Sequence, residues 1–114
     1  MNFVSLEFKL WRWQRIAALA LVPLVAFHLV YQYFVLGLDN ISFTAVSAKL
    51  HSHLLLTIDL VLLVAALTHG MIGLRGLILD YTSSSALATR VTVSVLGTTV
   101  AFVLYGVAAL LALR

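Results

Sequence analysis

The chain has 114 residues, of which 63% are hydrophobic and only 10% are charged. Soluble domains average roughly half apolar and about a quarter charged residues, so this composition excludes a soluble globular, a disordered or a nucleic-acid-binding protein. The formal net charge of +3 results from scarce acidic residues and not from a basic patch, and there is no cysteine. Without thiols, the chain has no disulfide, thiolate metal site or iron–sulfur ligand.

Three segments are long and apolar enough to cross a bilayer. Residues 16–38 and 91–113 carry no Asp, Glu, Lys or Arg, and residues 54–74 carry one charge, Asp59. A helix needs about 20 such residues to span about 30 Å of hydrocarbon, where the backbone must satisfy its own hydrogen bonds. The sequence therefore predicts an all-α membrane protein, a single transmembrane domain over residues 1–114, with helices near 12–37, 49–79 and 88–113.

The basic residues are distributed unevenly between the two ends of these helices. Lys49 and Arg114 lie at one end, and the other end carries five basic residues, Lys9, Arg12, Arg15, Arg75 and Arg90. By the positive-inside rule, the N-terminus and the second connection face the cytoplasm or the mitochondrial matrix. We expect an integral protein of a bacterial or archaeal cytoplasmic membrane, or of the mitochondrial inner membrane.

Ionisable side chains within the spans are candidates for function, because they are costly in a bilayer. His28 lies in the first span, and Asp59 and His69 lie in the second. With Arg15 and Arg75 as markers of the cytoplasmic surface, His28 is about 20 Å deep and His69 about 9 Å deep, at 1.5 Å per residue. Two axial ligands of one haem lie at nearly equal depth, so these two histidines would not bind the same iron. If both ligate haem, they serve two haems, each completed by another chain.

The residues around the histidines leave other interpretations open. Small residues on the face of His69 either make room for a macrocycle or allow close helix packing, and both histidines either ligate iron or form hydrogen bonds between helices. Asp59, about 24 Å deep by the same rise, either orients His28 through its second ring nitrogen or lies near the outer surface, bonded to water or to His53.

The stretch THGMIGLRGLILDY, from Thr68 to Tyr81, resembles the membrane-anchor subunits of succinate:quinone oxidoreductase, respiratory complex II. The family pattern is a haem-ligating histidine, a glycine four residues later, a basic or aromatic residue, and an aspartate followed by tyrosine or phenylalanine. The matching residues are His69, Gly73, Arg75, Asp80 and Tyr81. The segment WRWQRIAALALVPL is similar to the smaller of the two anchor subunits, and the resemblance extends over nearly the whole chain.

This resemblance implies three transmembrane helices that pack with a partner anchor subunit into a haem-binding bundle. Such an anchor is not catalytic alone. It attaches to the membrane a flavoprotein and an iron–sulfur subunit, which pass electrons from succinate to quinone. By the resemblance, His69 is an axial ligand of haem b, Tyr81 donates a hydrogen bond to a quinone carbonyl, and Asp80 helps to deliver protons. Arg15 or Arg75 would pair with haem propionates.

With a histidine at position 28, the first span resembles that of the two-haem members of the family. In those members the first helix ligates the outer haem and the second helix the inner one. We therefore expect two b haems shared with the partner anchor, with His28 at the outer iron. Two-haem members can also reduce quinone near the outer surface, where the relevant residues would be Tyr31, Tyr33, His51 and His53.

Two alternatives belong to other functional classes. The chain would be a haem-free structural or assembly subunit of another membrane complex if His28, Asp59 and His69 only bond helices together, and it would then be colourless. It would be a proton-relay subunit if Asp59 and the histidines carry protons, in which case loss of the Asp59 carboxylate would abolish activity while haem stays intact.

Overall fold

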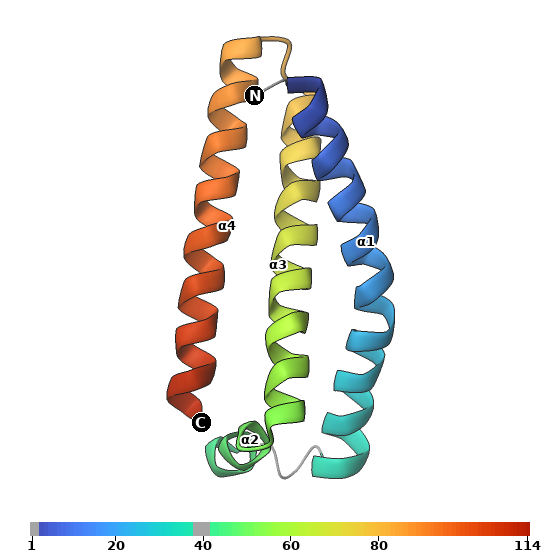
Figure 1. The fold of residues 1–114 in the computed structure, drawn as a ribbon, viewed down its shortest axis with the longest axis vertical. Helices are drawn as coiled ribbons and strands as arrows, with labels where there is room; N and C mark the ends of the chain where they lie inside the picture. The colour runs from blue at the N-terminus through green and yellow to red at the C-terminus, as the bar shows by residue number, and fades with distance from the viewer. Residues whose placement is uncertain (1–2, 38–41) are drawn as a thin grey trace.

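The computed structural model describes residues 3–37 and 42–114, and these residues are arranged as helices (Figure 1). Helix α1 is Phe3–Val30 and continues as the π-helical segment η1, Tyr31–Leu36; α2 is Phe43–Leu50, α3 is His53–Asp80 and α4 is Ser85–Leu113. No strand occurs within the described ranges. The segments long and apolar enough to cross a membrane are Val4–Leu36, His53–Asp80 and Ser85–Leu113. The expected all-α class with three candidate spans is therefore confirmed.

The helix bounds differ from the expected ranges for local reasons. α1 begins at Phe3 and not near residue 12, because its charged first turns pack against α3 through Glu7. The second helix was expected to begin near residue 49, but a short helix, α2, ends there and α3 begins only at His53. Serine caps fix the starts of α2, α3 and α4, since a capping hydroxyl accepts a hydrogen bond from a free backbone N–H. The acceptors are Ser42 before α2, Ser52 before α3 and Ser84 before α4.

Helix α3 is the central element of the bundle. α1 and α4 each pack along it, and contacts between α1 and α4 are few among the described residues. Figure 1 shows the start of α1 and the α3–α4 connection at one end, and α2, the end of η1 and the C-terminus at the other, with α2 lying across that end. The structure measures 50 × 25 × 23 Å, which makes it an elongated three-helix layer with open flanks.

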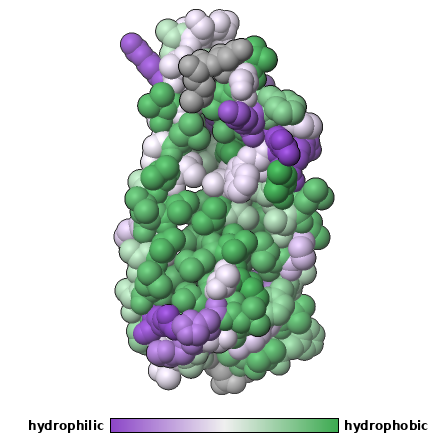
Figure 2. Space-filling model, in the orientation of Figure 1, coloured by the Kyte–Doolittle hydropathy of each residue, from purple (hydrophilic) through white to green (hydrophobic). Residues whose placement is uncertain are grey.

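Many large apolar side chains are exposed, because no other part of the described chain packs against them. The accessible surface is 7605 Å², whereas a compact monomer of this mass exposes about 6,200 Å². Figure 2 shows apolar side chains covering the middle of one face and hydrophilic side chains gathered towards both ends. Such a surface requires lipid or other apolar helices around it.

Candidate functional site

The two intramembrane histidines lie at different levels of the α1–α3 pair. Nδ1 of His69 is 3.3 Å from the carbonyl oxygen of Gln14. Nδ1 of His28 is 3.6 Å from Oδ1 of Asp59. His69 is therefore level with the first half of α1, and His28 with the first half of α3. From the separations of these residues along α1 and α3, the two levels are about 15–20 Å apart at 1.5 Å per residue.

This separation exceeds the roughly 10 Å difference in depth estimated from the sequence. The estimate treated Arg15 and Arg75 as markers of the same surface, and that assumption was wrong. Arg75 contacts Glu7, which precedes Arg15 by about 12 Å of helix. Because of this error, the estimated distance between the levels of His69 and His28 was too short. The conclusion that the two histidines do not face each other is unaffected.

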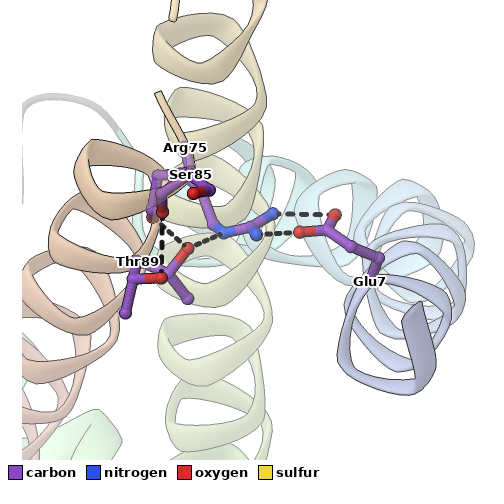
Figure 3. Close-up of polar contacts among 6 residues, drawn as sticks. Glu7, Arg75, Ser85 and Thr89 are labelled. Carbon is purple, nitrogen blue, oxygen red and sulfur yellow. Dashed lines mark hydrogen bonds and ion pairs between the residues drawn. The ribbon is translucent and has the colours of Figure 1, made fainter. Parts of the chain in front are cut away.

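Arg75 joins all three long helices at the N-terminal end of the bundle (Figure 3). Its Nε donates a 2.8 Å hydrogen bond to Oγ1 of Thr92 on α4, and Nη1 donates a 3.2 Å hydrogen bond to Oε2 of Glu7 on α1. Nη2 donates to the other oxygen of Glu7. The Arg75 residue is only 3% exposed. A haem propionate at Arg75 would therefore have to displace Glu7.

Arg15, the other candidate for a propionate, is free of such an ion pair in the described chain. Its side chain is exposed, and its guanidinium carbon lies 5.5 Å from the ring centroid of Trp11. A cation over an indole face is held only weakly at an exposed site, so the Arg15 guanidinium remains accessible to a carboxylate.

A cluster of polar side chains surrounds His28 at the other end of α1. Nζ of Lys49, on α2, lies 3.2 Å from Oδ1 and 3.1 Å from Oδ2 of Asp59. The same Nζ lies 5.3 Å from the ring centroid of Tyr31. Lys49 had counted only as a surface charge in the orientation argument, yet its side chain is 2% exposed. Of the two expected neighbours of Asp59, the structure places His28 beside it, whereas His53 contacts Arg114.

The imidazole of His28 stands at the wall of a groove. Its Nδ1 is buried and has no hydrogen-bond partner among the described residues, since 3.6 Å is too long for a hydrogen bond. The side chain as a whole is 35% exposed. The groove has a volume of about 300 Å³ and is lined by His28, Asp59, Leu62, Leu63, Ala66 and Leu110. His28 thus combines an inward Nδ1 with an accessible ring edge.

Asp80 and Tyr81 end α3 close to the N-terminal end of the bundle. Both side chains are exposed, Tyr81 to 87%. The backbone N–H of Tyr81 caps the helix by donating to the carbonyl oxygen of Ile78, and the N–H of Thr82 donates to that of Leu79. These bonds fix the backbone and leave the phenol exposed. A phenol beside a carboxylate can donate a hydrogen bond to a quinone oxygen and exchange protons with water.

The candidate residues do not form a metal site from this chain alone. Within residues 3–37 and 42–114, no three His, Cys, Asp or Glu side chains gather closely enough to hold a metal ion. A haem iron differs from such a metal site, because it would need only one histidine from this chain. The arrangement of His28 and His69 is compatible with one ligand to each of two haems.

Sequence reasoning missed the partners that fix these side chains. None of four residues was expected to take part in the site, although each contacts one of its candidate residues: Glu7, Gln14, Lys49 and Thr92. The signal for Glu7 was its position as the only acidic residue before the first span. The other three look like ordinary polar residues near helix ends, and nothing in their local spacing distinguishes them.

Comparison with known proteins identifies the family. A family model for the succinate dehydrogenase/fumarate reductase transmembrane subunit matches residues 2–110. No curated protein sequence matches the chain significantly. The family match covers almost the whole chain and includes the motif that ends in Asp80 and Tyr81. The chain therefore belongs to the family of succinate dehydrogenase/fumarate reductase transmembrane subunits.

Proposed function

We propose that this chain is a membrane anchor of succinate dehydrogenase that ligates haem b through His69 and helps to form the quinone site. The geometry of His69 carries the proposal. Its Nδ1 lies 3.3 Å from the carbonyl oxygen of Gln14. In the tautomer that donates there, Nε2 holds the free electron pair, which is the arrangement of most metal-ligating histidines. Nε2 has no partner within the described residues. When bound, the haem would relay single electrons towards quinone.

His28 has the same arrangement and supports a second haem. Its Nδ1 faces Asp59 of its own chain, and its other ring nitrogen is unpartnered in the described part of the chain. The level of His28 lies about 15–20 Å from that of His69, so a single macrocycle cannot serve both. Each iron would take its opposite ligand from a partner anchor subunit that packs on the open flanks of α3.

The residues Asp80 and Tyr81 support a quinone site at the N-terminal end of the bundle. Tyr81 is positioned to donate a hydrogen bond to a quinone oxygen, and Asp80 to exchange the proton that quinone reduction consumes. The excess of basic residues indicates that this end faces the cytoplasm or the matrix. An iron–sulfur subunit, with its flavoprotein, would dock on the same side and deliver electrons there.

The haem proposal is tested by visible redox difference spectra of the purified complex, with haem quantified per complex. We expect two b haems in the wild type, loss of one in His69→Ala, and loss of the other in His28→Ala. His51→Ala is the matched control, because it removes an exposed imidazole at the end of α2 and should leave both haems. An assembled His69→Ala complex with unchanged haem, or a colourless wild type, would refute the proposal and favour a haem-free structural subunit.

A further inference from the structure

We propose that Asp59 and Lys49 form a positioning and charge-tuning pair for His28. In this arrangement Asp59 orients the imidazole through Nδ1, and Lys49 neutralises the carboxylate. The inference rests on the proposed function, because it requires that His28 ligates a haem. It extends that function by assigning roles to a buried lysine and to a short helix that the anchor role alone does not require.

The first step concerns the carboxylate. Asp59 is 13% exposed inside an apolar span, where a charge is costly. Its Oδ1 is 3.6 Å from Nδ1 of His28, which is buried without any other partner. A shift of a few tenths of an ångström gives a hydrogen bond from Nδ1 to the carboxylate. Such a bond fixes the ring and makes its other nitrogen a stronger electron-pair donor.

The second step concerns the lysine. Both carboxylate oxygens of Asp59 lie within 3.2 Å of Nζ of Lys49, whose side chain is 2% exposed. Lys49 comes from α2, which lies across the end of the bundle (Figure 1) and begins at the Ser42 cap. A buried ion pair adds little stability over apolar side chains, so stability alone does not account for this pair. The position of the pair beside His28 accounts for it instead, because there its two charges act on the imidazole.

The charges then determine the redox behaviour. Asp59→Asn leaves the positive charge of Lys49 near His28, which favours the reduced haem and raises its midpoint potential. Lys49→Gln leaves the negative charge of Asp59 unneutralised, which favours the oxidised haem and lowers the potential. A pair that only held helices together would show no such opposite effects, because either substitution would simply loosen α2 from α3.

The test is a potentiometric titration of the purified complex, followed by its visible spectrum. Each single substitution should change the ratio of reduced to oxidised haem at a fixed potential about tenfold, or about 59 mV for a one-electron couple, in opposite directions. Only the haem that His28→Ala removes should shift. The double substitution should return close to the wild-type potential. Lys9→Gln, which removes the same charge from an exposed position on α1, is the control and should shift neither haem.

The outcomes separate this inference from the proposed function. If His28→Ala loses no haem, the haem role of His28 is wrong and the tuning role fails with it. If His28→Ala loses one haem, but the single substitutions leave its potential unchanged or shift it in the same direction, the tuning role alone is wrong. Each single variant tests the sign by itself, so failure of one to assemble leaves the other decisive.

Discussion

The ion pair between Glu7 and Arg75 makes a quantitative prediction about the attachment of α1. In Glu7→Ala, the guanidinium of Arg75 keeps its 2.8 Å bond to Thr92 but loses both carboxylate acceptors. The substitution does not weaken the helix itself, because alanine has a higher helix propensity than glutamate. Any loosening of α1 therefore reports the lost contact with α3.

The magnitude follows from the burial of the two partners. Removing one member of a fully buried ion pair costs about 3–5 kcal/mol. The side chain of Arg75 is 4% exposed, but that of Glu7 is 39% exposed, so water reaches the vacated position. We therefore expect a smaller cost of about 2 kcal/mol, between the values for buried and surface pairs. This corresponds to an increase of about 30-fold in the equilibrium constant for local opening.

The assay is hydrogen–deuterium exchange of the purified complex, read by mass spectrometry over residues 4–15. Glu7→Ala should speed exchange in this segment about 30-fold, and Ser5→Ala, at an exposed neighbouring position, should leave it unchanged. Arg75→Met should have a smaller effect than Glu7→Ala, because it removes the buried charge instead of leaving it without a counter-ion. Exchange within threefold of wild type in an assembled Glu7→Ala complex would refute the role given to this pair.

Two further predictions concern helix packing and the quinone site. A Cβ atom at Gly106 would lie 2.7 Å from Cδ2 of Leu63. Overpacking costs about 1–3 kcal/mol and the helix propensity of alanine returns about 1 kcal/mol, so Gly106→Ala should destabilise the complex by about 1 kcal/mol in thermal unfolding, and less than additively with Leu63→Ala. Additive losses would mean that the two residues do not touch. Tyr81→Phe should lower quinone reduction about a hundredfold while haem content and electron transfer to a water-soluble acceptor stay normal; normal quinone reduction would exclude the Tyr81 phenol from the site.

The three spans were predictable because hydropathy is a local property. Each span is an uninterrupted apolar segment, and the bilayer thickness sets its length. α2 was not predicted, since its eight residues lie below the length at which apolar periodicity distinguishes a helix from a loop. Only the Ser42 and Ser52 caps mark its limits. Asp39 and Asn40, which are residue types common in turns, lie outside the described residues.

The polar contacts of the site were less predictable, because they join residues far apart in sequence. The possible contact of Asp59 with His28 came from their similar depths, which were counted by helix rise from Arg15 and Arg75 although these two residues lie at different levels. The partner of Arg75 could not be found in this way, since Glu7 lies before the span and 68 residues from Arg75. Charge counting treats each basic residue as a free surface charge, and both Arg75 and Lys49 are buried in ion pairs.

The contacts that fix the fold of the α1–α3 pair also prepare its histidines. In lipid, helices gain little from apolar burial, so polar contacts and close packing set their register. α1 and α3 meet through polar contacts at three levels: Glu7 with Arg75, Gln14 with His69, and His28 with Asp59. A slip by one helical turn would displace all three contacts by about 5.4 Å. The register that satisfies Arg75 therefore also directs Nδ1 of both histidines into the chain and leaves their other ring nitrogens without a hydrogen-bond partner among the described residues.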